Sequence, residues 1–146
     1  MKKKPKILVA TGSRADFGLL KLPLTALVES HRFEIGLVVT GTHLSPQHGH
    51  TIEEIRESGF HIWGEVDLRL DGYTQDEVCR YMSRALEGVS GVLTREKPDL
   101  LMLLGDRYEM LAVASAAMIH NVPMAHIHGG EATWGLIDDP VRHSLS

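Results

Sequence analysis

The protein has 146 residues, which is enough for one domain with a buried core. Its composition, 43% hydrophobic and 23% charged, is that of an ordinary globular domain. The formal net charge of -4 argues against nucleic acid or an anionic membrane surface as a partner, because both attract positively charged proteins. A single cysteine, Cys79, excludes an internal disulfide and a cysteine-based zinc site.

The start of the chain does not have the pattern of a signal peptide. Its basic residues are followed by a short apolar run at 7–10 and then by the polar sequence TGSRAD. No stretch approaches the roughly 20 apolar residues that a membrane-spanning helix needs. We therefore expect a cytoplasmic protein.

Strand and helix patterns alternate along the first half of the chain. Residues 6–10 are apolar and end at the turn-forming sequence TGS, which predicts a strand. Residues 19–30 carry apolar side chains at helical spacing, with Pro23 placed near the first turn of the expected helix, where proline is tolerated. Residues 33–41 are rich in β-branched side chains and end in glycine, which predicts a second strand.

The alternation continues through the second half. A helix is expected at 51–58, where Thr51 and Glu54 have the spacing of a capping box. A long helix is expected later, because acidic side chains occupy its first turn and the sequence KPD follows its end. The expected elements of this half are a short strand at 61–67, the long helix at 74–96, an apolar strand at 100–104, an Ala-rich helix at 108–120 and a strand at 124–127.

Strands that alternate with helices of this length predict a parallel sheet with right-handed crossovers. The expected fold class is therefore α/β, a Rossmann-like open parallel sheet with helices on both faces, formed by residues 1–146 as one domain. Ligands of such folds bind at the carboxyl ends of the strands. Four polar segments follow expected strands: TGSRADFG, TGTHLSPQHGH, GDRYE and HGGEATWGLIDDPVRH. The sequence thus predicts a ligand site at this edge of the sheet.

Each residue of these segments also has a purely structural explanation. The glycines fit tight turns, and Ser13, Asp16 and Asp106 fit helix N-caps. His126 fits a hydrogen-bonded core histidine, and the charged residues at 138–143 fit a capping and ion-pair cluster. Independent structural needs do not require all of them to fall at one edge of the sheet. Their coincidence therefore favours a functional site.

The histidines raise the alternative of a metal-dependent hydrolase. His126 and His128 lie on the same side of an extended segment, and Glu131, Asp138 and His143 are further potential ligands. The chain lacks an HExxH helix motif, however, and two-residue spacing on a strand is common by chance. Acid–base chemistry uses the same groups without a metal. We therefore expect no metal and no other cofactor.

Four segments keep their order and spacing over essentially the whole chain: GSRADFGLL, VTGTHLS with HGHTIEEI, GDRYEMLA, and HIHGGEATWGLIDDPVRHSLS. Together they resemble the hydrolysing UDP-N-acetylglucosamine 2-epimerases of the bacterial sialic-acid type. The resemblance implies the amino-terminal half of a two-domain glycosyltransferase B architecture, with the active site between two Rossmann-like domains. It also implies conversion of UDP-N-acetylglucosamine and water to N-acetylmannosamine and UDP through a 2-acetamidoglucal, in sialic or related nonulosonic acid biosynthesis.

The resemblance assigns roles to residues at the strand ends. The catalytic residues that it implies are Asp106, His128, Glu131, Asp138, Arg142 and His143. The substrate-binding residues that it implies are Arg14, Asp16, Gly41, His43, Arg107 and Asp139. Many relatives carry a carboxylate where this chain has His128. Whether His128 or Glu131 is the main acid–base group is therefore open.

The chains of this family are more than twice as long as the 146 residues at hand. The family's second domain, which binds most of the UDP, has no counterpart within them. We therefore expect the amino-terminal half of an enzyme that is inactive alone, and a homo-oligomer in the full-length form, with a UDP-sugar as substrate. A non-catalytic binding or oligomerisation module is a third hypothesis. The sequence leaves open whether the sugar is N-acetylglucosamine or a diacetamido-dideoxy analogue.

Overall fold

The computed structural model describes residues 2–127, which form an open sheet of five parallel strands in the order β3-β2-β1-β4-β5. The strands are β1 (Lys6–Thr11), β2 (Glu34–Thr40), β3 (Ile62–Val66), β4 (Leu100–Leu104) and β5 (Met124–Ile127). The helices are α1 (Arg14–Glu29), α2 (Ile52–Glu57), α3 (Gln75–Glu96) and α4 (Tyr108–Ile119), with two short 3₁₀ helices, η1 (Gly41–Leu44) and η2 (Pro46–His48). The α/β fold class expected from the sequence is confirmed.

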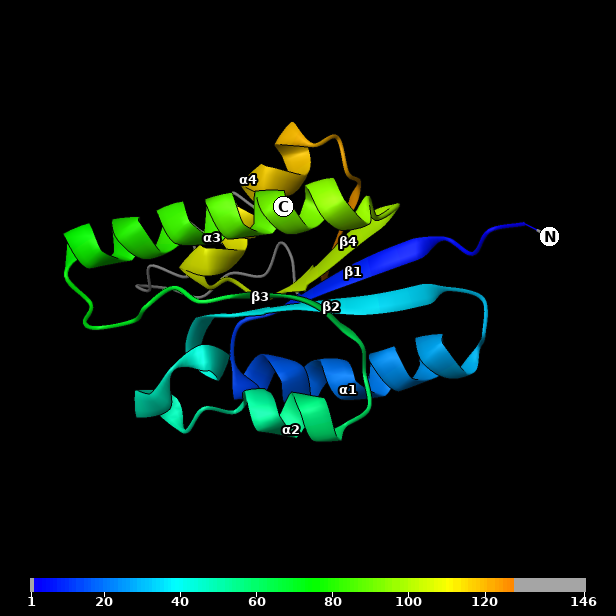
Figure 1. The fold of residues 1–146 in the computed structure, drawn as a ribbon, viewed down its shortest axis with the longest axis horizontal. Coiled ribbons are helices and arrows are strands. Elements are labelled where there is room, and N and C mark those ends of the chain that lie inside the picture. The colour runs from blue at the N-terminus through cyan, green and yellow to red at the C-terminus, as the bar shows by residue number, and fades with distance from the viewer. Residues whose placement is uncertain (1, 128–146) are drawn as a thin grey trace.

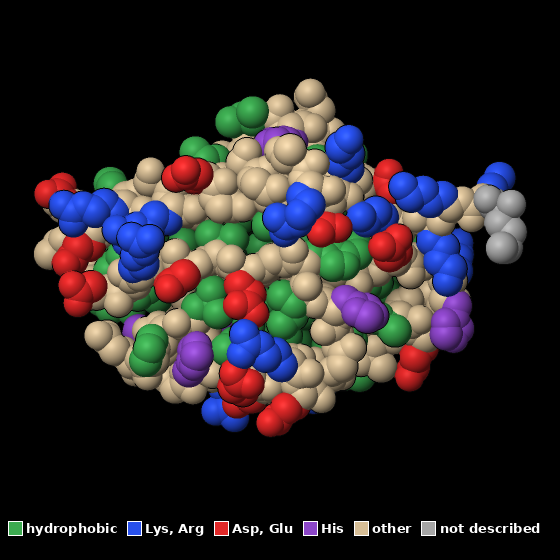
Figure 2. All heavy atoms as spheres, in the orientation of Figure 1, with side chains coloured by type: hydrophobic (Ala, Val, Ile, Leu, Met, Phe, Trp, Pro, Cys, Tyr) green, Lys and Arg blue, Asp and Glu red, His purple; other side chains and the backbone are tan. Residues whose placement is uncertain are grey.

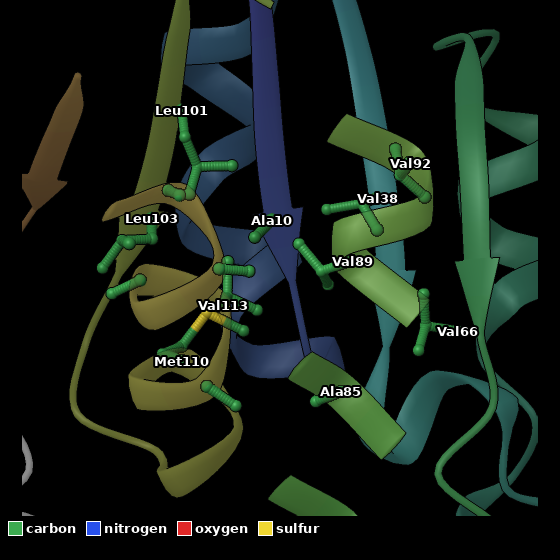
Figure 3. Packing of buried hydrophobic residues seen from close by; sticks show 14 of the residues in the cluster. Ala10, Val38, Val66, Ala85, Val89, Val92, Leu101, Leu103, Met110 and Val113 are labelled. Carbon is green, nitrogen blue, oxygen red and sulfur yellow. The ribbon is translucent and has the colours of Figure 1, made fainter. Parts of the chain in front are cut away.

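Helices cover both faces of the sheet (Figure 1), so each face has its own core. On one face α3 and α4 pack on the strands through small and branched side chains such as Val38, Val89 and Val113 (Figure 3). On the other face Phe17, Leu20 and Leu24 of α1 and two isoleucines of α2 cover the strands. The double cover explains why β1, β2 and β4 are apolar at successive positions rather than at alternate ones.

The surface over these layers is mixed in charge. Acidic and basic side chains are interspersed on the face that Figure 2 shows. Within residues 2–127, no helix combines the length and the apolar character that crossing a membrane requires.

Helix α1 begins earlier than the apolar pattern predicts. Ser13 is extended and its hydroxyl accepts the backbone N–H of Asp16 at 3.2 Å, so the helix starts at Arg14. Pro23 therefore lies inside the helix, and its predicted place near the first turn is wrong. The misplaced start has a physical reason: Arg14 and Asp16 interrupt the apolar periodicity of the first turn, which lies at the edge of the sheet.

The capping box predicted for α2 is also wrong. Thr51 precedes the helix, but its side chain makes no capping bond and is hydrogen-bonded to His43 instead. Glu54 forms an ion pair with Arg14. A capping box does form at the start of α3, where Thr74 and Glu77 each bond the backbone of the other. The same Thr-x-x-Glu pattern thus caps α3, whereas at the start of α2 its two side chains contact other segments of the chain.

His43 holds the segment after β2 in place. Its side chain is fully buried, and its two ring nitrogens are hydrogen-bonded to Thr11 Oγ1 at 2.9 Å and Thr51 Oγ1 at 2.8 Å. A neutral imidazole has one donor and one acceptor nitrogen, which suits two hydroxyl partners. Burial lowers the pKa of His43 to about 4, so the ring is neutral at pH 7. The end of β1 is thereby tied to the start of α2.

The two glycines Gly36 and Gly91 provide a matched test of the sheet packing. A Cβ on Gly36 would lie 1.8 Å from Trp63 Cδ2, whereas a Cβ on Gly91 would meet nothing within 4 Å. We expect Gly36→Ala to lower the free energy of unfolding by about 1–3 kcal/mol through overpacking. Gly91→Ala should raise it by up to about 1 kcal/mol, because alanine favours the helix. Denaturant unfolding measures both; equal effects of the two substitutions would contradict this account.

The buried imidazole of His43 predicts a pH-dependent stability. Between about pH 6.5 and pH 4 the unfolded chain takes up a proton at this histidine that the folded chain does not. Stability from this group is therefore lost as the pH falls, by roughly 3 kcal/mol across that interval. We expect the stability of the wild type relative to His43→Gln, measured by denaturant unfolding, to fall by this amount from pH 7 to pH 4. A difference that stays constant over this range would refute the prediction.

Candidate active site

The strand order places the turns after β1 and β4 side by side, at the point where the connections leave in opposite directions. Ligands of open α/β sheets bind at this position. The turn after β1 leads into α1 and brings Asp16, in the first turn of that helix, to the edge of the sheet. Asp16 Oδ2 is buried and has no hydrogen-bond partner within residues 2–127. Burial raises the pKa of this carboxyl group.

The turn after β4 is fixed by the neighbouring strand. Gly105 has a φ of +84°, its N–H donates to the carbonyl of Ile127 at 3.0 Å, and its carbonyl accepts Nε2–H of His126 at 2.7 Å. His126 is thus a half-buried histidine whose ring is hydrogen-bonded, in agreement with the structural role considered for it in the sequence analysis. These bonds hold Asp106, which directly follows Gly105 and is half-buried. The N-cap of α4 is Arg107, so Asp106 is not a helix cap.

Arg107 and Glu109 form a short ion pair at the start of α4. Arg107 Nε lies 2.5 Å from Glu109 Oε1, with the arginine side chain 33% exposed and the glutamate side chain fully buried. Burial alone would lower the pKa of Arg107, but the charges of Glu109 and Asp16 outweigh it and raise the pKa. Burial raises the pKa of Glu109 even beside this guanidinium. Arg107 is therefore ion-paired with Glu109 of its own helix and acted on by the charge of Asp16, which lies in α1.

The turns after β1 and β2 close tightly around this pair. Gly41 has a φ of +63°, and a Cβ there would lie 2.4 Å from the carbonyl oxygen of Gly12. A Cβ on Gly12 would lie 2.7 Å from Glu109 Oε1. Thr42 donates its N–H to the same Gly12 carbonyl at 2.9 Å. The two glycines thus let the backbone approach the buried carboxylate.

The predicted site residues within residues 2–127 separate into two groups. Asp16, Gly41 and Arg107 gather at the ends of β1, β2 and β4, and Asp106 adjoins them in sequence. His43 is buried beneath them, and its predicted contact with substrate stays a prediction. Arg14 is 72% exposed and pairs with Glu54 at 3.2 Å. The remaining predicted residues, His128, Glu131, Asp138, Asp139, Arg142 and His143, lie outside the described residues.

Sequence reasoning missed Glu109. The residue stands in the quoted motif GDRYEMLA, but we gave it no role. The signal was available: α4 is apolar on every side apart from its ends, so a glutamate in its first turn has to be buried or to break the pattern. Thr11 and Thr51, the partners of His43, carried no such signal.

A metal site finds no support in the part of the chain that the structure describes. Within residues 2–127, no three His, Cys, Asp or Glu side chains are grouped so as to hold a metal ion. His126 uses Nε2–H as a donor to the carbonyl of Gly105. His128 and Glu131, which the metal hypothesis also needs, lie outside the described residues.

A hollow of about 580 Å³ lies between β3 and α3, away from the ends of β1 and β4, and is lined by three arginines and three acids among other residues. Two of its arginines are engaged with the backbone: Arg84 donates to the Leu68 carbonyl and Arg95 donates to the Trp63 carbonyl. These bonds cap carbonyls near the edge strand of the sheet. The ends of β1 and β4 are therefore the better candidate for a ligand site.

Comparisons with known proteins identify the family of this chain. Residues 25–146 match the family described as UDP-N-acetylglucosamine 2-epimerase. The chain is 40% identical over 141 residues to the UDP-N,N'-diacetylbacillosamine 2-epimerase (hydrolyzing) of Legionella pneumophila, covering 97% of this chain and 37% of that protein. It is 39% identical to the polysialic acid biosynthesis protein P7 of Escherichia coli, covering 97% and 36%.

The fold also matches solved structures. The UDP-GlcNAc 2-epimerase of Neisseria meningitidis bound to UDP-GlcNAc superposes with a TM-score of 0.76 at 19% identity, covering 96% of this chain and 38% of that one. At this identity the likeness concerns the fold alone. The chain spans little more than a third of the length of the relatives named above. From the match over residues 25–146 and the identity to curated relatives, the chain belongs to the UDP-N-acetylglucosamine 2-epimerase family, a family of sugar-nucleotide 2-epimerases.

Proposed function

We propose that these residues form the amino-terminal half of the active site of a hydrolysing UDP-2-acetamido-sugar 2-epimerase. The observation that carries the proposal is Arg107 at the ends of β1 and β4, which is ion-paired with the buried Glu109 and acted on by the charge of Asp16. A guanidinium between acidic groups, at the ligand-binding position of the fold, offers donors for phosphate and an acceptor for sugar hydroxyl or amide groups.

The names of the relatives support this substrate class. The Legionella pneumophila protein is named for UDP-N,N'-diacetylbacillosamine, and the Neisseria meningitidis structure is named as bound to UDP-GlcNAc. Both compounds are UDP-linked 2-acetamido sugars. The Escherichia coli relative is named for polysialic acid biosynthesis, which supports a place in sialic or related nonulosonic acid biosynthesis. We propose UDP-N-acetylglucosamine as the substrate and N-acetylmannosamine and UDP as the products.

The proposed reaction has two steps. In the first, a base removes the proton from sugar C2, the C1–oxygen bond breaks, and UDP leaves with the bonding electron pair, giving a 2-acetamidoglucal. In the second, water adds across this double bond, placing hydroxyl on C1 and a proton on the opposite face of C2. The first step needs a base and a stabiliser for the leaving phosphate, and the second needs an acid and an activated water.

The chain offers groups for each task. Asp106 is held at the end of β4 as an acid–base group, and Arg107 contacts the anionic part of the substrate. The remaining assignments rest on sequence alone: His128 and Glu131 share the acid–base work, and Asp138, Arg142 and His143 complete the catalytic group with Asp139 as a substrate contact. A homo-oligomer is proposed for the full-length protein.

A direct assay tests this proposal. We expect the full-length protein to release UDP and N-acetylmannosamine from UDP-N-acetylglucosamine, with turnover unaffected by a chelator. The 146-residue chain alone should show negligible turnover, because positioning the substrate and excluding water need the second half of the cleft. Free UDP is measured by a coupled assay and the sugar by NMR. Sustained turnover by the 146-residue chain, or a full-length protein inactive on every UDP-2-acetamido sugar, would argue against the proposal.

Asp106→Asn in the full-length protein tests the acid–base role at the end of β4. We expect kcat to fall by roughly 10²-fold or more, the usual scale for loss of a positioned acid–base group. The fold should persist, because α4 is capped from Arg107 and the turn is fixed by bonds of Gly105 to β5. Steady-state kinetics and a thermal melt check both statements. A variant with near wild-type kcat would leave Asp106 with a structural role only.

A further inference from the structure

Glu109 is a buried carboxylate that the proposed reaction does not use. Its side chain is fully buried, Oε1 bonds Arg107 Nε at 2.5 Å, and Oε2 is buried with no hydrogen-bond partner within residues 2–127. The residue lies in the first turn of a helix whose interior, apart from Ser115, is apolar. Structural needs alone do not favour such a group, because an unsatisfied buried carboxylate oxygen destabilises the folded state.

The surroundings of Glu109 are shaped to admit it. Gly12 and Gly41, from the turns after β1 and β2, lie close to Oε1. A Cβ on Gly12 would be 2.7 Å from this oxygen, and a Cβ on Gly41 would be 3.0 Å from it. Gly41 has in addition a positive φ of +63°. Two turns of the ligand-binding edge are therefore built around one carboxylate.

Glu109 fixes one particular atom of its partner. Its Oε1 accepts a hydrogen bond from Nε–H of Arg107. Within residues 2–127 the two terminal nitrogens of that guanidinium make no hydrogen bond. A planar guanidinium held through Nε presents its terminal nitrogens as a rigid fork. The charge of Asp16 acts on this guanidinium from the turn after β1, and Asp16 Oδ2 is itself without a partner in the same part of the chain.

We infer that Glu109 is a positioning residue, which holds Arg107 through Nε so that its terminal nitrogens bind an anionic oxygen of the substrate beside Asp16. The inference rests on the proposed function for the identity of that substrate. The chemistry fits a sugar phosphate: the guanidinium fork donates to phosphate oxygens, and the unpartnered oxygen of Asp16 accepts from a sugar hydroxyl or acetamido N–H. Glu109 touches neither, since its side chain is fully buried.

The test is Glu109→Gln in the full-length protein, which keeps the shape and removes the charge. We expect KM for UDP-N-acetylglucosamine to rise by roughly tenfold with kcat changed less, since a misaligned binding group weakens ground-state and transition-state binding together. The melting temperature should fall, because removing one partner of a buried ion pair leaves Arg107 without its counter-charge, so the kinetics are measured at a temperature where the variant is folded. A purely structural role would leave KM of the folded variant unchanged, and that result would overturn the inference.

A double-mutant cycle with Arg107→Lys shows whether Glu109 acts through Arg107. Lysine keeps the charge but lacks the fork. In the Arg107→Lys background, Glu109→Gln should raise KM no further; additive losses would overturn the inference. Glu53→Gln is the matched control, because Glu53 Oε1 also lies 2.5 Å from an arginine nitrogen but is 59% exposed. We expect this control to leave KM and the melting temperature unchanged.

One measurement is independent of activity. In protein labelled with ¹⁵N-arginine, the Nε–H signal of Arg107, assigned by its loss in Arg107→Lys, should lie downfield in the wild type. It should move upfield in Glu109→Gln, because an amide oxygen is a weaker acceptor than a carboxylate. If the full-length protein releases no UDP, the proposed function fails and this signal still decides the inference. An Nε–H signal unchanged by Glu109→Gln would overturn it.

Discussion

The ion pair between Glu109 and Arg107 constrains the whole ligand-binding edge of the sheet. A fully buried carboxylate needs a cation close by to offset the loss of its hydration. Arg107 is that cation, and the ion pair fixes it at the start of α4. The carboxylate also leaves no space for a Cβ at Gly12 or Gly41. The ends of β1, β2 and β4 consequently meet at one point, and their spacing is set by a single glutamate side chain.

The segment after β2 is held at this edge by neutral groups. His43, Thr11 and Thr51 connect the end of β1 to the start of α2 through two hydrogen bonds to an uncharged ring. A protonated imidazole there would add a buried positive charge near Arg107. Burial prevents this at neutral pH, so the edge is rigid without the histidine competing with Arg107 for anions.

Local patterns were enough to predict the layers but not the contacts between their ends. The strands and their cover by helices on both faces followed from apolar runs such as residues 100–104. A strand buried on both faces is apolar at every position, not at alternate ones. The start of α1 and the role of Thr51 did not follow, because Arg14 pairs with Glu54, 40 positions away, and Thr51 bonds His43, 8 positions away. Candidate ligand residues were identified by their types, whereas Glu109 became visible only through its burial.

The charges at the site explain how it can receive an anion. One guanidinium, Arg107, faces the carboxyl groups of Asp16 and Glu109, and with both ionised the group would carry a net negative charge that repels phosphate. Burial raises the pKa of each carboxyl group, which disfavours their charged forms and so weakens this repulsion. Glu109 occupies Nε of Arg107, which leaves the terminal nitrogens as the donors for an anion. The geometry of the ion pair, rather than a surplus of positive charge, therefore suits this arginine to an anionic substrate.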